Sequence, residues 1–497
     1  MNWMNIPPGL KQTGIRIGAV SLVKAMGLIG RIILTRMAGP EGIGLFQIAY
    51  SYFGFMLMLI TGGLPTSLAM YTARQPALGW IWFKRLSVLL VFIGGTLCLL
   101  TLAYSSSISR WLGNPVLEPF IRSLSLAIFV VPLLNLLRGY LQGLEHYGVI
   151  AVSELMEQAV RIGIMLGVTW LWLPKGVMFA VGRSLIGTAL GGIAAFVVLL
   201  LFLRHVGQKN GIQPLTPTGA SDGLWLIKSS LVISVTRLLI PFSDMLDAII
   251  IPLRLQTAGY TSTQATAMYG LLTGMALLVV YMPTTVTAAI SHTLTMKLVL
   301  AWQEQRFVYF VKNSRKAMEL VWISGIISSS FLWIYNRGLS QLFFNSTQTA
   351  ELIRCLSLIP LLVGIREVST SILWAQENKK VSLIGTTIGI TVATLSHYYL
   401  IPLDGFHLMG AVAGVLLMEL TIMAGNLIGL RNVLKEIHMG SLAVHTLVIA
   451  AISALVIGLG DWIILPVNWG NYSILPNMLL FFLLNGVYLM IHYRFRS

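Results

Sequence analysis

The chain has 497 residues, of which 56% are hydrophobic and only 10% are charged. Soluble domains carry about 25% charged residues, so this composition argues against a water-soluble enzyme or nucleic-acid-binding protein. The formal net charge is +16, from 33 Lys+Arg against 17 Asp+Glu, and its meaning depends on where the basic residues lie.

Fourteen hydrophobic stretches follow one another, each with the roughly 20 apolar residues that a membrane-spanning helix needs. They predict an all-α polytopic membrane protein with short loops. The first stretch contains cations and no small-residue cleavage site follows it, so we expect no cleaved signal peptide. The two cysteines predict no disulfide framework. The stretches are centred near Met26, Met56, Phe92, Val130, Ile162, Leu190, Leu239, Leu278, Ile326, Leu362, Thr391, Met418, Ala450 and Leu483.

Two residue pairs indicate a weak internal repeat, with chance similarity as the alternative. Arg36 precedes Pro65 by 29 positions, and Arg254 precedes Pro283 by the same 29. A duplication predicts two pseudo-symmetric six-helix lobes related by an axis along the membrane normal. Both prolines lie inside predicted spans, as packing kinks or as hinges for alternating access. The predicted domains are an N-lobe (1–205), a cytoplasmic linker (206–224), a C-lobe (225–432) and two extra helices (433–497).

The basic residues of the predicted loops are distributed asymmetrically. With the N-terminus in the cytoplasm, 19 Lys and Arg fall on the cytoplasmic side and 7 on the other. This ratio follows the positive-inside rule and predicts a bacterial cytoplasmic membrane protein with both termini in the cytoplasm. Most of the +16 is therefore a topology signal that fits anionic membrane lipid and requires no nucleic acid.

Ionisable residues within spans are costly and commonly face a cavity or a partner. In the first span, Lys24 and Arg31 are seven residues apart, on one face and about 10 Å apart along the axis. No acid in the same helix can pair with them, which favours a water-filled cavity that receives an anion. The alternative is pairing with an acid on another helix. The other intramembrane charges are Arg138, Glu154, Glu157, Arg161, Arg183, Arg237, Asp244, Asp247, Arg366, Glu367 and Glu419.

The fifth and seventh spans each hold charges of both signs on one face. Glu157 and Arg161 have i,i+4 spacing, which favours a self-neutralised pair. Arg237 and Asp244 share a face and Asp247 lies one turn beyond, as either a gate or a structural ion pair.

Two later spans also carry ionisable groups. Arg366 and Glu367 are adjacent and point apart, so each needs its own partner. Glu419 stands alone in the twelfth span, as either a proton or sodium site or a carboxylic acid kept neutral by desolvation.

Signatures of catalysis and of ATP use are missing from the sequence. It contains no Gly-Lys dipeptide for a phosphate-binding loop and no His-Glu-x-x-His. The eight histidines show no metal-ligand spacing. We therefore expect no enzyme activity, no bound metal and no cofactor. The candidate energy sources are a proton or sodium gradient, the membrane potential or the substrate gradient.

Four stretches carry recognisable motifs, namely residues 31–46, 138–143 (Arg-Gly-Tyr-Leu-Gln-Gly), 157–161 and 254–276. These stretches resemble the stage V sporulation protein B family, which belongs to the multidrug/oligosaccharidyl-lipid/polysaccharide (MOP) exporter superfamily. The resemblance implies fourteen helices in two pseudo-symmetric lobes, as in multidrug-and-toxin extrusion (MATE) transporters. It also implies undecaprenyl-pyrophosphate-linked saccharides as substrates, including the peptidoglycan precursor lipid II.

The resemblance also assigns candidate residues. Lys24 falls where the lipid II flippases carry an Arg, and Arg36 and Gly39 match their pattern. A second flippase Arg aligns with Gly30, next to Arg31, and residues 369–377 lack the family's Gln-Gly motif. The candidates for pyrophosphate binding are Lys24, Arg31, Arg36, Arg138 and Arg237, those for ion coupling or gating are Glu157, Arg161, Asp244, Asp247 and Glu419, and the hinges are Pro65 and Pro283.

The leading hypothesis is a monomeric flippase for a lipid-linked saccharide in cell-wall or spore-cortex synthesis, with cell-wall synthesis proteins as further partners. A cation-coupled multidrug antiporter of the MATE type is the alternative, although cations in the first span favour an anionic substrate. A membrane glycosyltransferase would normally expose a large hydrophilic loop, which is absent here. A non-transporting scaffold for a biosynthetic complex is the fourth hypothesis.

Overall fold

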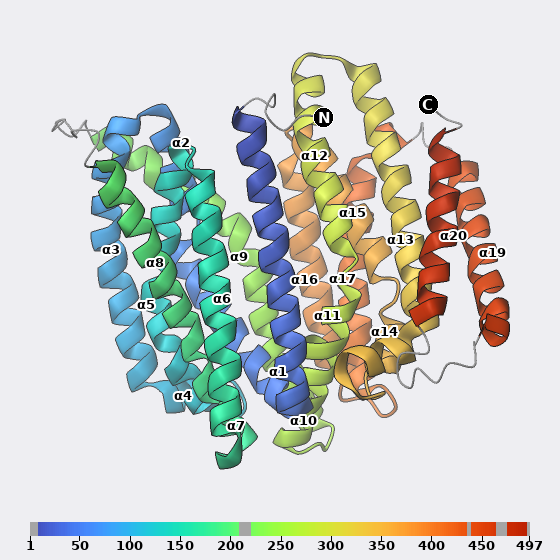
Figure 1. The fold of residues 1–497 in the computed structure, drawn as a ribbon, viewed down its shortest axis with the longest axis horizontal. Helices are drawn as coiled ribbons and strands as arrows, with labels where there is room; N and C mark the ends of the chain where they lie inside the picture. The colour runs from blue at the N-terminus through green and yellow to red at the C-terminus, as the bar shows by residue number, and fades with distance from the viewer. Residues whose placement is uncertain (1–7, 208–219, 435–438, 464–474, 495–497) are drawn as a thin grey trace. The chain divides into compact units, whose positions relative to one another are not determined.

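The computed structural model describes residues 8–207, 220–434, 439–463 and 475–494, and in these ranges the chain is helical without β-strands (Figure 1). Eleven segments there are long and apolar enough to cross a membrane. The predicted all-α polytopic membrane protein is confirmed. The segment Gly18–Arg74 covers two predicted spans. The two remaining predicted spans are also helices. Tyr147–Trp172 is charged, and Ile359–Ala375 is only 17 residues long. The structure is thus consistent with fourteen spans.

Contacts divide the chain into two compact units, the first containing residues 1–253 and 261–270 and the second containing the rest. The helices of the first unit are α1 (Pro8–Thr61), α2 (Leu64–Arg74), α3 (Pro76–Ala103), α4 (Ser105–Trp111), α5 (Glu118–Gly143), α6 (Tyr147–Trp172), α7 (Val177–Ser184), α8 (Ile186–Gly207), most of α9 (Ala220–Thr257) and α10 (Ser262–Tyr269). Those of the second are α11 (Leu277–Val280), α12 (Thr284–Gln303), α13 (Phe307–Phe344), α14 (Ala350–Cys355), α15 (Ile359–Ala375), α16 (Lys379–Leu400), α17 (His407–Gly429), α18 (Arg431–Leu434), α19 (Met439–Ile463) and α20 (Leu475–Arg494).

Helix α9 is grouped with the first unit, whereas the internal repeat assigns it to the C-lobe. The grouping has a physical reason, because α9 packs on the break between α1 and α2. The backbone N–H of Gly63 donates to Ser234 Oγ over 2.7 Å. The predicted linker lies mostly at residues 208–219, outside the described residues. The lobe boundaries therefore stay a prediction.

Helix α1 contains a sharp turn that separates two spans. Gly39 has φ 68° and ψ −178°, a left-handed conformation that favours glycine, and Pro40 follows it. The Arg31 guanidinium donates a hydrogen bond to the Gln47 side chain, 16 residues later. In a continuous helix these residues would be about 24 Å apart, beyond the reach of their side chains. The contact therefore requires the chain to turn back at Gly39.

The turn is fixed by close packing against α10 and the π-helical segment η4 (Gly270–Ala276). A Cβ atom on Gly44 would lie 2.1 Å from the carbonyl oxygen of Thr266, and one on Gly270 would lie 2.0 Å from that of Pro40. Both distances are far below van der Waals contact. These glycines let two backbones meet where larger residues would separate them.

We expect Gly44→Ala to destabilise the protein by about 1–3 kcal/mol, because the added methyl group forces the Thr266 backbone to move. Gly54→Ala is the matched control in the same helix. No atom lies within 4 Å of its added Cβ, so it should be neutral or stabilising by up to about 1 kcal/mol. The measurement is thermal unfolding of the purified proteins followed by tryptophan fluorescence. Equal effects of the two substitutions would contradict the packing argument.

The repeat prolines lie at helix breaks. Helix α1 ends at Thr61, Gly62 has φ 41°, and α2 begins one residue before Pro65. Helix α11 ends at Val280, and Pro283 is the residue before α12. Proline at such positions has no backbone N–H to leave unsatisfied in the first helical turn. The predicted kinks are thus interruptions of two spans, and a hinge role for Pro65 and Pro283 stays a prediction.

The second unit is built around α13 and α15. Their buried side chains, including Phe310, Val321 and Ile372, form one hydrophobic core with those of α12. Helices α19 and α20 attach to α13: Trp322 Nε1 donates to Thr446 Oγ1 over 3.1 Å, and the hydroxyl of Tyr335 donates to the carbonyl of Asn477 over 2.9 Å. Figure 1 shows these two helices, in red, beside α13.

Candidate functional site: two intramembrane charge clusters

The first unit contains a group of polar residues that we call the arginine cluster. Its members come from α1, α5 and α6 and are Arg31, Gln47, Arg138, Glu157, Gln158 and Arg161. The helices that carry them pack closely, since a Cβ atom on Gly27 of α1 would lie 2.7 Å from the Gln158 amide. This approach brings the polar face of α6 against α1.

Arg31 is half-buried in this cluster. Its guanidinium donates to Gln47 and lies 5.8 Å from the ring centroid of Phe46, in a cation–π arrangement. Both partners are neutral, so neither cancels the charge of Arg31. Arg161 lies near enough to repel that charge, and its own guanidinium donates to Gln158. Two arginines are thus held in place by neutral amides.

Within the described residues, Arg138 is the one arginine of the cluster that pairs with a carboxylate. Its Nη1 lies 2.7 Å from Glu157 Oε2, and its Nε donates to Ser153 Oγ over 3.1 Å. Nη2 of the same guanidinium is buried without an acceptor in the described part of the chain. Arg138 therefore keeps a donor available inside the first unit.

This geometry corrects the expected Glu157–Arg161 pair. Glu157 pairs with Arg138 of the neighbouring helix, and Arg161 turns to Gln158 instead. Helical spacing places Glu157 and Arg161 on one face but says nothing of a closer cation on α5. Among the described residues Arg31 and Arg161 have no carboxylate partner, so the arginine cluster has two positive charges without a direct counter-ion there.

The other predicted binding cations lie outside this cluster. Lys24, Arg36 and Arg237 are exposed, and Lys24 has no side-chain partner within the described ranges. Lys24 lies on the same helix as Arg31, seven residues earlier. Arg183, also exposed, lies 4.4 Å from the ring centroid of Phe179. Of the predicted binding residues, Arg31 and Arg138 both lie beside α6, Arg31 near Arg161 and Arg138 against Glu157.

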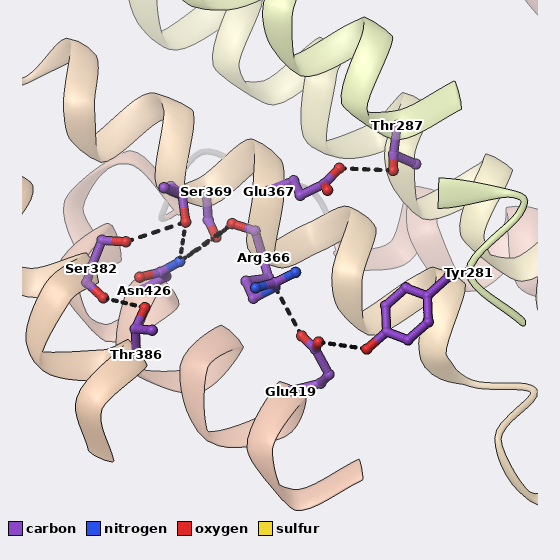
Figure 2. Close-up of polar contacts among 10 residues, drawn as sticks. Tyr281, Thr287, Arg366, Glu367, Ser369, Ser382, Thr386, Glu419 and Asn426 are labelled. Atoms are coloured by element: carbon purple, nitrogen blue, oxygen red, sulfur yellow. Dashed lines mark hydrogen bonds and ion pairs between the residues drawn. The ribbon is translucent and has the colours of Figure 1, made fainter. Parts of the chain in front are cut away.

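The second unit contains an acidic counterpart, which we call the carboxylate cluster (Figure 2). Its members are Tyr281, Thr287, Arg366, Glu367 and Glu419. Nε of Arg366 on α15 lies 2.8 Å from Oε2 of Glu419 on α17, and the side chain of Glu419 is 2% exposed. The hydroxyl of Tyr281 donates to Oε1 of Glu419 over 3.1 Å. Glu419 stands alone within its own span, but it has partners from other parts of the chain.

The ion pair is not an aligned hydrogen bond, since neither Arg366 Nε nor Glu419 Oε2 meets the geometry of one. Charge attraction therefore holds these groups together. Glu367 points the other way and accepts a hydrogen bond from Thr287 Oγ1 over 3.1 Å. The two adjacent ionisable residues have separate partners, as their spacing predicts. One guanidinium and two carboxylates leave this cluster with a formal charge of −1.

Asn426 extends the carboxylate cluster toward α16. Its Nδ2 donates to Thr370 Oγ1 over 2.8 Å, to Ser369 Oγ over 3.2 Å and to the Arg366 carbonyl over 3.3 Å. Its Oδ1 is buried without a donor in the described part of the chain. Thr370 in turn contacts Ser382 Oγ at 3.4 Å. These neutral oxygens are ligands of the type that hard cations such as Na⁺ prefer.

The predicted gating residues of α9 are not part of either cluster. Asp244 is exposed, and Asp247 is half-buried with a partner of its own. Sequence reasoning also missed Gln47 and Gln158, which bind the two arginines, and Asn426, which binds two hydroxyls and a backbone carbonyl of α15. The signal that could have found them is an uncharged amide inside an apolar span, since such a group requires hydrogen-bond partners there.

We expect Glu157→Gln to destabilise the protein by about 3 kcal/mol, because it leaves the charge of Arg138 uncompensated in a poorly hydrated site. Glu118→Gln is the control in the same unit. Glu118 also pairs with an arginine at 2.7 Å, but its partner Arg122 is 59% exposed, so the loss should be below about 1 kcal/mol. Thermal unfolding of both variants measures the difference, and a larger effect at Glu118 would contradict it.

Comparison with known sequences identifies relatives over most of the chain. The profile of the family described as "Polysaccharide biosynthesis protein" matches residues 10–294. Stage V sporulation protein B of Bacillus subtilis (strain 168) is 25% identical over 426 residues, covering 83% of this chain and 82% of the relative. Lipid II flippase MurJ of the same organism is 23% identical over 482 residues, covering 89% and 86%.

Solved structures share the fold at low sequence identity. Lipid II flippase MurJ in an inward closed conformation has a TM-score of 0.72 and 14% identity, covering 96% of this chain and 98% of that structure. An inward-facing multidrug resistance MATE family transporter of the MOP superfamily has a TM-score of 0.69 and 15% identity, covering 84% and 97%. Both comparisons show the helical fold that the sequence predicted.

Proposed function

Because this chain belongs to the polysaccharide biosynthesis protein family, we propose that it is a flippase of the MOP superfamily. Its substrate is an undecaprenyl-pyrophosphate-linked saccharide, specifically a peptidoglycan precursor such as lipid II. It moves this substrate across the bacterial cytoplasmic membrane by alternating access. Stage V sporulation protein B and the lipid II flippase among its relatives support a role in cell-wall or spore-cortex synthesis.

The observation that carries the proposal is the uncompensated charge of the arginine cluster. A pyrophosphate has about two negative charges, and the cluster has two positive charges that no carboxylate of the described residues pairs with. Guanidinium groups form short, charge-assisted hydrogen bonds to phosphate oxygens. Arg138 Nη2 is a buried donor without an acceptor in the described residues, as a phosphate contact would require. The partners of Arg31 in the described part of the chain are neutral, so a phosphate can approach it without displacing a carboxylate.

The carboxylate cluster is the second element of the proposal. Its formal charge of −1 and its neighbouring amide and hydroxyl oxygens suit a cation, which supports H⁺ or Na⁺ coupling at Glu419. The membrane potential can act on the same charges. An anion-binding cluster in one unit and a cation-binding cluster in the other would allow transport of the substrate to be coupled to transport of a cation. Both termini are proposed to lie in the cytoplasm.

The experiment is a flipping assay with purified protein in proteoliposomes that contain labelled lipid II. We expect protein-dependent appearance of lipid II in the opposite leaflet and a faster rate with an imposed ion gradient. Protein-free vesicles and vesicles with a labelled phospholipid are the controls. A rate equal to that of protein-free vesicles, under every gradient, would overturn the proposal.

The alternative is a cation-coupled multidrug antiporter, favoured by the buried Glu419 and by the fold shared with a MATE transporter. A transporter of cationic drugs needs acids where the drug binds. The arginine cluster of the first unit instead contains more arginines than acids. Dye efflux from cells discriminates the two hypotheses. Efflux that is lost in Glu419→Gln would favour the antiporter, and absent efflux with active lipid II flipping would favour the flippase.

A further inference from the structure

Three residues far apart in the sequence converge where α19 and α20 meet α13. Oε1 of Glu319 lies 3.0 Å from Nε2 of His445 and 3.8 Å from Nε2 of His492. The two imidazole rings meet edge to face, with centroids 4.6 Å apart. One potential ligand atom from each residue lies within 4.8 Å of the other two. The three side chains therefore point at one small volume.

A simple hydrogen bond between a carboxylate and a histidine accounts for only two of these residues. Here two imidazole nitrogens approach the same carboxylate oxygen, although each comes from a different helix. His445 is buried, and the other two are half-buried. The site lies beside a pocket of about 530 Å³ that Ser441, His445, Tyr488 and His492 help to line. An ion or water could therefore reach the three side chains from this pocket.

We propose that Glu319, His445 and His492 form a binding site for a divalent transition-metal ion of the zinc type. Two imidazoles and one carboxylate are a donor set that such ions prefer over Mg²⁺ or Ca²⁺. Ligands of a tetrahedral zinc at about 2.0–2.1 Å lie roughly 3.3 Å from one another. The observed separations of 3.0 and 3.8 Å lie on either side of that value.

The surroundings supply the outer contacts that metal ligands use. Tyr488 forms a hydrogen bond with Nδ1 of His445, which directs Nε2 of that ring toward Glu319. Ser441 Oγ donates to Oε1 of Glu319 over 3.1 Å. Such second contacts fix the tautomer and orientation of a ligating histidine. A water molecule from the pocket would complete a four-coordinate site.

The site would join the two C-terminal helices to the rest of the second unit. Glu319 belongs to α13, whereas His445 and His492 belong to α19 and α20. A bound ion would stabilise the folded state by its binding free energy, since the ligands are not preassembled in the unfolded chain. Because the ligands come from three helices, the spacing of histidines in the sequence does not predict them.

The test is metal binding by the purified full-length protein in detergent, after treatment with a chelator. Zn²⁺ is titrated in competition with a chromophoric chelator, and Co²⁺ is added separately to record its visible absorption. We expect one Zn²⁺ per chain, intense absorption from tetrahedral Co²⁺, and a higher unfolding temperature with Zn²⁺. The Co²⁺ spectrum tests the wild-type protein without depending on any variant.

Variants assign the ligands. Glu319→Gln, His445→Gln and His492→Gln should each weaken Zn²⁺ binding at least tenfold and remove the rise in unfolding temperature. Tyr488→Phe should weaken binding by about tenfold, because it removes an outer contact and no ligand. His205→Gln, which removes an exposed histidine from the end of α8, should bind as the wild type does. Absence of stoichiometric binding to the wild type, or full binding by folded His445→Gln, would overturn the proposal.

Discussion

Replacing Lys24 and Arg31 together with alanine is expected to abolish transport while the protein still inserts into the membrane. Arg31 contributes one of the uncompensated charges of the arginine cluster, and Lys24 lies two turns away on the same helix. A hydrogen bond to a charged group is worth about 1.5–3 kcal/mol, so losing two such contacts should lower the flipping rate at least about 100-fold. The measurements are complementation of a flippase-deficient strain and lipid II flipping in proteoliposomes.

Two substitutions separate charge from structure in this experiment. Arg183→Ala removes an exposed arginine of the same unit whose guanidinium packs on Phe179, and it should leave the flipping rate within about twofold. Arg31→Lys keeps the charge but loses the planar fork that binds phosphate, so an intermediate rate is expected. Full activity of the Lys24→Ala, Arg31→Ala double variant would contradict a role of the arginine cluster in binding the pyrophosphate.

The helices and their order could be predicted from the sequence because the bilayer imposes a simple rule on length and hydropathy. Length and hydropathy are judged for each segment separately. The two spans of α1 can therefore be told apart in the sequence, although almost no loop separates them at Gly39. The predicted kinks at Pro65 and Pro283 differ from the structure for a different reason. A proline indicates that a helical hydrogen bond is missing, but not whether the helix bends or ends there.

Partners across helices could not be predicted in the same way. The spacing of Glu157 and Arg161 suggests a pair, yet Arg138 takes the carboxylate from a neighbouring helix. Glu419 has no charged neighbour along its own helix, yet Arg366 pairs with it. Periodicity gives the face on which a side chain lies but not the helix that packs against that face. Packing of this kind depends on close approach at small residues, as between Gly27 and Gln158.

The charge distribution acquires a clearer meaning once these partners are known. The +16 of the whole chain is mostly a matter of loops and topology. Within the described spans, charge is separated instead: the arginine cluster has two positive charges in excess, and the carboxylate cluster has one negative charge in excess. Keeping such groups unbalanced at membrane depth is costly, and binding of oppositely charged ligands would compensate the cost.

Removing Arg366 is expected to be the most destabilising of the single substitutions that we consider. In Arg366→Ala the carboxylate of Glu419, 2% exposed, keeps only the hydroxyl of Tyr281 as a partner among the described residues. Breaking a buried ion pair in this way costs about 3–5 kcal/mol. Glu419→Gln should cost less, because the side chain of Arg366 is 20% exposed and can reach more water. Thermal unfolding of the purified proteins measures both losses.

Replacing both partners distinguishes structural support from ion coupling. The double variant Arg366→Met, Glu419→Met removes both charges at once, so its stability should lie close to that of the wild type. The exposed pair of Glu304 and Arg306 is the control, and Glu304→Gln should change stability by less than about 1 kcal/mol. If the carboxylate cluster couples ions to transport, the folded double variant will lose the stimulation of flipping by an ion gradient. Gradient-stimulated flipping at the wild-type rate in that variant would limit the cluster to a structural role.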